Sequence, residues 1–247
     1  GKNALLANTT AANNVALGMD TLSANTTGTR NLAIMKNALN SSDTEDDNIA
    51  IGYDSMTTNT AGGTGNVALG NYTLDALTSG DYNVAMGHTA LGANSTGGSN
   101  VAIGHEALLT NTTASNNTGV GFQSLKLNST GDSNVAVGWH SLAANTTGYY
   151  NNAIGRDALL ANTEGAHNIS LGSDTMKANT TGNSNVAVGG YSLEANTTAS
   201  NNIAVGYTAL RANTTGTRNI AIGVNAYNSS DTENDNIAIG YDAMTTN

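Results

Sequence analysis

The chain has 247 residues, of which 11% are charged and 4% aromatic, and it contains neither cysteine nor proline. So few aromatic residues exclude the bulky core of an ordinary globular domain of this length, and the lack of cysteine excludes a disulfide framework or a thiolate zinc site. The net charge of −10 argues against nucleic acid and anionic membranes as partners, and no apolar run is long enough to cross a bilayer.

A repeat of 17 residues organises the whole chain. Its signature is Asn-aliphatic-Ala-aliphatic-Gly, and the glycine recurs every 17 residues from Gly1 to Gly240, with one methionine in its place and one step of 18 residues between Gly52 and Gly70. Because nothing lies outside the pattern, we expect one repetitive domain over 1–247 with about 14.5 coils. The chain starts on Gly1 rather than methionine, so we expect a fragment of a longer fibre whose coils continue at both ends.

Each repeat predicts two short strands, one at the signature and a second at the short apolar element that follows it. In the signature at 14–18, Val15 and Leu17 flank Ala16, and this alternation predicts a strand whose two aliphatic side chains share the interior face. Four residues after the glycine, 11 of 15 repeats carry leucine. Glycine, β-branched residues and an Asn-Thr-Thr-Gly turn leave no room for a helix. The repeat therefore predicts an all-β fold, a parallel β-solenoid (β-roll) with 17-residue coils.

The first position of the signature is asparagine in all 14 complete signatures. Stacked at the strand spacing of about 4.8 Å, these amides can bond from coil to coil while they satisfy backbone groups of the turns. We therefore interpret the column as a structural asparagine ladder, made of Asn14, Asn31, Asn48, Asn66, Asn83, Asn100, Asn117, Asn134, Asn151, Asn168, Asn185, Asn202, Asn219 and Asn236.

The middle position of the signature is alanine in 12 of 14 occurrences, with Gly119 and Ser170 as the exceptions. If the flanking aliphatic side chains point inward, this position points outward, where polar residues would be tolerated. A continuous outward stripe of small apolar side chains indicates close packing against another chain. We therefore expect a homotrimer with an inter-chain alanine stripe at its axis, made of Ala16, Ala33, Ala50, Ala68, Ala85, Ala102, Ala136, Ala153, Ala187, Ala204, Ala221 and Ala238.

The signature Asn-Ile-Ala-Val-Gly at 202–206 resembles the head repeats of trimeric autotransporter adhesins. The full repeat, 202–216, is more similar still to the repeat arrays of phage tail-fibre-like and bacterial surface fibre proteins. This resemblance covers the whole chain, although the adhesin-head unit is shorter than 17 residues. It implies a left-handed β-roll, three chains around an axis, and attachment or scaffold work outside the cell.

Two groups of side chains have the chemistry of metal ligands. His88 and His105 share a column one coil apart, with Glu106 beside the second, but no third ligand follows at a fixed spacing, so we favour a surface stripe over a zinc site. An acidic turn that occurs twice carries alternating carboxylates, which suit a hard cation such as Ca²⁺. No glycine-centred calcium loop accompanies it, so a solvated turn is favoured and Ca²⁺ is the weaker hypothesis for Asp43, Glu45, Asp47, Asp231, Glu233 and Asp235. We expect no bound metal and no cofactor.

The variable position after the signature glycine collects aromatic and histidine side chains. An exposed column of rings can stack against sugars or a partner, but it can also pack between chains or cap strands. We keep surface recognition of a cell-surface glycan or receptor as one hypothesis for Tyr53, His88, His105, Phe122, Trp139, Tyr207 and Tyr241.

The turn of nine repeats reads Asn-Thr-Thr or Asn-Ser-Thr, formally a glycosylation acceptor. Turn chemistry explains the motif without sugars, and we prefer that interpretation. Threonines repeated in register also raise the alternative of an ice-binding solenoid. Against it, they occupy a turn rather than a strand face, and the acidic turns interrupt them.

No catalytic constellation or phosphate-binding loop is present in the sequence, so we expect no enzyme activity. The leading hypothesis is a structural or adhesive fibre segment outside the cell, on a cell surface or a virion. Its partners would be further copies of itself, side by side and end to end, without membrane contact in this segment. Ice binding remains the alternative.

Overall fold

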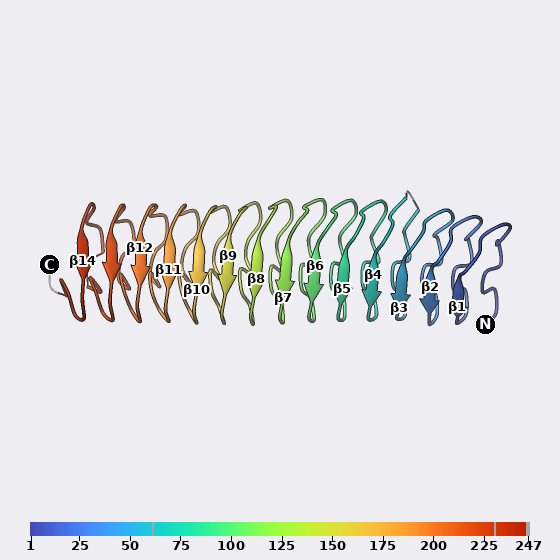
Figure 1. Ribbon diagram of the computed structural model, residues 1–247, viewed down its shortest axis with the longest axis horizontal. Helices are drawn as coiled ribbons and strands as arrows, with labels where there is room; N and C mark the ends of the chain where they lie inside the picture. Colours follow the sequence, from blue (N-terminus) through green and yellow to red (C-terminus); the bar gives the residue numbers. More distant parts are fainter. Residues whose placement is uncertain (61, 230, 246–247) are drawn as a thin grey trace. The chain divides into compact units, whose positions relative to one another are not determined.

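The computed structural model describes residues 1–60, 62–229 and 231–245, where every regular element is a short β-strand (Figure 1). The chain forms two compact units, 1–122 and 123–247. The strands of the first unit are β1 (Val15–Leu17), β2 (Leu32–Ile34), β3 (Ile49–Ile51), β4 (Val67–Leu69), β5 (Val84–Met86), β6 (Val101–Ile103) and β7 (Thr118–Val120). Those of the second are β8 (Val135–Val137), β9 (Asn152–Ile154), β10 (Ile169–Leu171), β11 (Val186–Val188), β12 (Ile203–Val205), β13 (Ile220–Ile222) and β14 (Ile237–Ile239).

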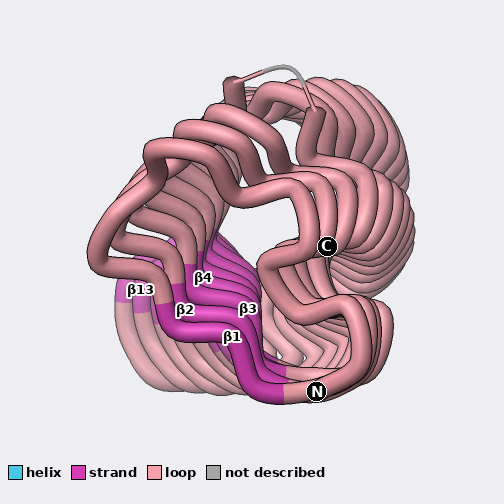
Figure 2. Tube along the Cα trace, turned by 90° about the vertical axis from the view of Figure 1, so that its right-hand side faces the viewer, coloured by secondary structure: helices cyan, strands magenta, loops and turns pink. Residues whose placement is uncertain are grey.

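Within each unit, successive strands pair in parallel, one strand per coil, as the stacked strands β1 to β4 show in Figure 2. The register equals one repeat, so that Ala85 of β5 pairs with Ala102 of β6. Between β3 and β4 the longer step is absorbed outside the strands, because Ile49 still pairs with Val67. The predicted all-β parallel β-solenoid is therefore confirmed.

The alanine of each signature lies inside the coil, so the expectation of an inter-chain alanine stripe is wrong. Ala16 is half-buried, and the alanines from Ala33 to Ala238 are at most 2% exposed within the single chain. Ser170, in the same column, shows how narrow the interior is, because its Oγ donates to the carbonyl oxygen of Thr175 at 3.0 Å. Such a gap admits only a methyl or hydroxymethyl group, so the larger aliphatic side chains on either side turn outward.

The leucine column supplies most of the largest buried side chains, but it does not form the expected second strand. Leu74, Leu91 and Leu108 are fully buried, as is Tyr227, which takes the same place near the end of the chain. Leu91 has a φ of 51°, which lies in the left-handed region and outside the β region. Its backbone N–H donates to the carbonyl of Ala107 at 3.0 Å, so this part of the coil stacks as a turn.

Two buried columns of asparagine complete the interior. In the first, Asn83 Oδ1 accepts from the backbone N–H of Asn100 at 3.0 Å and from its Nδ2 at 3.1 Å. Asn100 Nδ2 also donates to the carbonyl of Ala114 at 2.9 Å. In the second column, Asn111 Nδ2 donates to Asn94 Oδ1 at 3.0 Å. Such amides tie their own coil together and bond to the neighbouring coil.

The second column is interrupted where Ser42 replaces the asparagine and Glu45 replaces the glycine three residues later. In an ordinary coil, a Cβ on Gly28 would lie 2.5 Å from Asn25 Oδ1. The serine provides space, and the Glu45 carboxylate turns inward to accept from Ser42 Oγ at 2.8 Å and from Asp43 N at 2.7 Å. As a consequence, Asn25 Oδ1 is buried without a hydrogen-bond partner.

We predict that Ser42 and Glu45 are energetically coupled. Ser42→Asn alone crowds the buried carboxylate, and Glu45→Gly alone leaves buried donors without an acceptor. Each single variant should therefore lower the free energy of unfolding by about 1–3 kcal/mol. The double variant restores the asparagine–glycine pair and gives Asn25 Oδ1 a donor, so it should be at least as stable as the parent. Thermal unfolding of the parent, the two single variants and the double variant gives the double-mutant cycle. If the change in unfolding free energy of the double variant equals the sum of the two single changes, the coupling is contradicted.

Candidate functional site

Within each unit, the outward side chains of the strands form an apolar band, and we call these bands the aliphatic stripe. It exists because the narrow interior accepts only the central residue of each strand. Ile103 is 38% exposed and Ile203 37% exposed, although further strands of the same unit precede and follow each of them. In the first unit the stripe comprises Val15, Leu17, Leu32, Ile34, Ile49, Ile51, Val67, Leu69, Val84, Met86, Val101, Ile103 and Val120. In the second it comprises Val135, Val137, Ile154, Ile169, Leu171, Val186, Val188, Ile203, Val205, Ile220, Ile222, Ile237 and Ile239.

Polar residues interrupt the aliphatic stripe once in each unit. Thr118 begins β7 in the first unit and is half-buried, and Asn152 begins β9 in the second unit and is exposed. Asn152 pairs with Ile169 of the next strand, so its side chain stands in a column that is otherwise aliphatic in that unit. The alternation predicted from the sequence would have turned both side chains to the interior.

The predicted aromatic column is present and stacks on itself in the first unit. The rings of His88 and His105 lie 5.4 Å apart at 10°, and those of His105 and Phe122 lie 5.5 Å apart at 11°. Tyr53 reaches this column through Tyr72, with ring centroids 5.5 Å apart. Because the faces of the stacked rings contact one another, only their edges are offered to a sugar or a partner. The stacking itself stabilises successive coils.

In the second unit the aromatic side chains form separate contacts instead of one column. Trp139 stacks on His140 with ring centroids 3.6 Å apart, and Tyr207 meets Tyr191 edge to face at 5.7 Å. Tyr241 is 75% exposed. Sequence reasoning missed Tyr72 and Tyr191 as ring partners, because they stand one residue later than the predicted column.

A second aromatic group in the second unit was also missed. Tyr149 contacts Tyr150 and His167 with ring centroids 5.5 Å and 5.3 Å away, and Tyr150 stacks on His167 at 5.2 Å. The only signal in the sequence was an adjacent pair of tyrosines with a histidine one repeat after the second. These rings fill the space between them, so they form a packed patch rather than a cage.

The histidine pair does not converge on a metal position. His88 and His105 face each other ring to ring, and His105 Nδ1 lies 4.0 Å from Glu106 Oε1. In the ranges 1–60, 62–229 and 231–245, no group of three or more histidine, aspartate or glutamate side chains is arranged to hold a metal ion.

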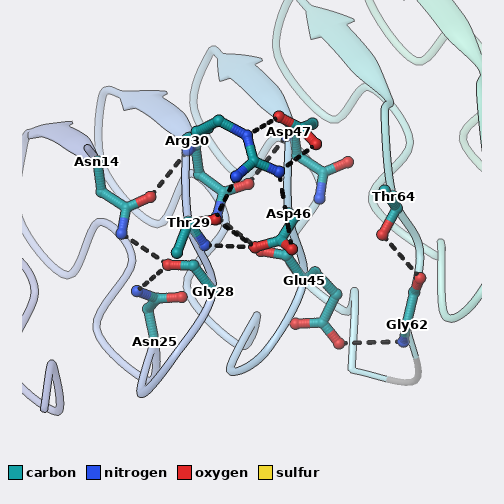
Figure 3. A network of polar contacts seen from close by, with 12 residues as sticks. Asn14, Asn25, Gly28, Thr29, Arg30, Glu45, Asp46, Asp47, Gly62 and Thr64 are labelled. Atoms are coloured by element: carbon teal, nitrogen blue, oxygen red, sulfur yellow. Dashed lines mark hydrogen bonds and ion pairs between the residues drawn. The ribbon is translucent and has the colours of Figure 1, made fainter. Parts of the chain in front are cut away.

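The acidic turns direct their carboxylates to different partners. Asp47 forms a double hydrogen bond with Arg30, with Nε–Oδ1 and Nη2–Oδ2 distances of 2.5 Å and 2.7 Å (Figure 3). That hydrogen bonding holds the pKa of Asp47 below its usual value. Glu45 points into the coil, and Asp235 is held by Arg218 as Asp47 is held by Arg30. Among the described residues, the alternating carboxylates therefore do not form the Ca²⁺ cluster of the weaker hypothesis.

Two aspartates in the second unit form a buried ionic cluster that the sequence did not reveal. The side chains of Asp157 and Asp174 are 6% and 5% exposed. Lys177 Nζ lies 2.7 Å from Asp174 Oδ1 and 3.5 Å from Asp157 Oδ2, and Arg156 pairs with both carboxylates. Burial works to raise the pKa of Asp174, but the hydrogen bond from Lys177 and the nearby positive charges outweigh burial and lower it.

A small apolar hollow of about 320 Å³ also lies in the second unit. Leu127 and Leu160 flank it, and the coil between them contributes Ala143 and Ala144 to its floor. The hollow results from two bulky side chains on either side of a coil with small ones. Its sequence signal was a leucine at positions that neighbouring repeats leave to alanine.

Apart from Asn8 in the first coil, which is exposed, the Asn-Thr-Thr and Asn-Ser-Thr turns place their asparagines inside the coil. Asn94 and Asn111 are fully buried, and their Nδ2 atoms donate to the carbonyls of Gly97 and Ala114, each at 2.9 Å. The first hydroxyl of the turn is also engaged, because Thr146 Oγ1 donates to a carbonyl of the next coil at 3.0 Å. Glycosylation of such a turn would have to pull a bonded amide out of the core, and in the turn at 145–147 only the second threonine, Thr147, is exposed.

Comparison with protein-family models, with curated proteins and with solved structures found no match to this chain. Among the described residues, no helix has the length and apolarity that crossing a bilayer requires.

The ionic cluster predicts how stability depends on pH. Because the folded pKa of Asp174 is lowered, its stabilising effect is present above the unfolded pKa of about 3.9 and is lost as pH falls through the folded pKa. Asp174→Asn should therefore lower the melting temperature at pH 7 and should make less difference below pH ~4. Glu164→Gln, at an exposed turn, is the control and should have little effect at either pH. An Asp174→Asn effect that is constant with pH would contradict the ion-pair account.

Proposed function

We propose that this chain is a structural and adhesive segment of an extracellular fibre and that it performs no reaction. In this proposal three copies assemble side by side as left-handed solenoids, and their coils continue end to end. The aliphatic stripe is the observation that carries the proposal. It replaces the alanine stripe as the contact surface between copies, because the alanines are already buried within each chain.

The size of the aliphatic stripe supports self-association. Seven strands per unit, spaced about 4.8 Å apart and about 10 Å wide, give a flat area of roughly 330 Å² in each unit. Both units together offer about 650 Å² per copy, near the ~800 Å² that one partner contributes to a standard interface. A second and a third copy are suitable occupants, because their own stripes need the same cover.

The extracellular setting and the adhesive role are supported by the resemblance to adhesin heads and surface fibres. Contact of this chain with a glycan or receptor would use the edges of the rings in the aromatic column, since the ring faces are stacked. Ice binding is the less favoured alternative, because one of the two hydroxyls of a turn such as Thr146–Thr147 is already bonded to the next coil. Glu164 also breaks the file of exposed threonines.

We predict that charge on the aliphatic stripe dissociates the assembly without unfolding the chain. Val186→Glu with Ile203→Glu should convert the trimer to monomers in light scattering, with an unchanged circular dichroism spectrum, because these side chains face outward. Ala187→Glu, in the same strand as Val186, should instead unfold its coil, because this position is fully buried.

The matched control is Thr181→Glu with Thr198→Glu, which adds the same charge to exposed turns of neighbouring coils. It should leave the trimer intact. A parent chain that is monomeric at micromolar concentration would contradict the proposed assembly. Electron microscopy of the assembled chain should in addition show filaments longer than one molecule.

A further inference from the structure

Copies that associate through a periodic surface face a register problem. One coil of the aliphatic stripe is nearly identical to the next, so two copies displaced by a whole coil would bury almost the same apolar area. Register is weakly specified wherever the pairing surface repeats. Some feature of the stripe must therefore differ from coil to coil if the copies are to align uniquely.

Asn152 is that feature in the second unit. It is exposed at the start of β9, between Val135 and Ile169 in the same outward column. Its backbone N–H donates to the carbonyl of Asn168 at 2.8 Å. Its side-chain amide makes no hydrogen bond to the described part of its own chain. The amide is thus available to a partner, unlike the buried asparagines of the two interior columns.

We propose that Asn152 fixes the register of neighbouring copies, which align in parallel so that the Asn152 side chains of different copies meet. This inference rests on the self-association proposed above. An asparagine amide carries both donors and an acceptor, so identical side chains around a common axis can satisfy one another. A single asparagine in an apolar seam selects register in coiled coils by the same physical principle.

Displacement by one coil would place each Asn152 amide against Val135 or Ile169 of a neighbouring copy. A buried amide without a partner is unfavourable, whereas the aliphatic contacts are almost unchanged by the displacement. The aligned arrangement is therefore preferred by the amides alone. One such unpaired amide suffices for a tenfold preference, which corresponds to about 1.4 kcal/mol.

The charge next to Asn152 does not oppose this alignment. Arg156 follows β9 in the same coil, so alignment brings the Arg156 residues of different copies to the same level. Its guanidinium is already paired with Asp174 and Asp157 of its own chain. The like charges are thus offset locally before the copies meet.

Disulfide mapping tests the register directly, because the chain has no cysteine of its own. A tagged Ile154→Cys chain is refolded with an untagged chain that carries Leu171→Cys or Val188→Cys, one or two coils away on the same outward column. A disulfide requires Cα atoms within about 7 Å. Aligned copies should link only like positions, whereas displaced copies should yield mixed products, which the tag identifies by mass.

In the parent background, like-position products should exceed mixed products at least tenfold. Asn152→Val, which introduces the residue found at Val135, should raise the mixed products at least tenfold while the assembly persists in light scattering. Asn152→Thr, which keeps a polar group, should give an intermediate ratio. Thr181→Val, an exposed control outside the stripe, should leave the ratio at the parent value.

Two outcomes would overturn the inference in distinguishable ways. Equal ratios in the parent and Asn152→Val backgrounds, with the assembly intact, would show that Asn152 does not set register, and the proposed fibre would still stand. A monomeric parent chain without any disulfide product between copies would overturn both the register and the self-association on which it rests.

Discussion

The hydrogen bonding of buried asparagine side chains is the interaction on which the rest of this structure depends. Each amide of the ladder closes its own coil and bonds to the coil before it, as Asn100 does with Ala114 and Asn83. Polar groups in the interior are tolerable only because they are satisfied. A side chain that must reach both partners cannot move far from either, so the ladder holds each coil at a fixed, narrow width.

That narrow width determines which residues face the solvent. An interior in which Ser170 reaches the carbonyl of Thr175 admits alanine but not valine or isoleucine. The aliphatic side chains that flank the alanine in each strand are therefore displaced to the outside, where Ile154 is 45% exposed. The proposed fibre follows from this outward placement of the aliphatic side chains, since the apolar surface that one chain cannot bury is available for burial between chains.

The period, the parallel strands and the asparagine ladder were predictable because each leaves a direct mark on the sequence. Alternation along Val101-Ala102-Ile103 shows that two faces exist, but it does not say which face is inside. Hydrophobicity favoured the wrong face, and the correct one depends on the coil width, which no single repeat encodes. The left-handed backbone at Leu91 and the ionic cluster around Asp174 were hidden for a similar reason, because both arise from contacts between coils.

Hydrogen exchange of side-chain amides measured by NMR tests the central role of the ladder most directly. Asn100 and Asn117 are fully buried, whereas Asn116 and Asn183 are exposed in similar turns. The account predicts that the Nδ2 protons of Asn100 and Asn117 exchange at least a hundredfold more slowly than those of Asn116 and Asn183, because exchange requires a coil to open. Equal rates for the two pairs would show that the amides are accessible to water and would contradict the account.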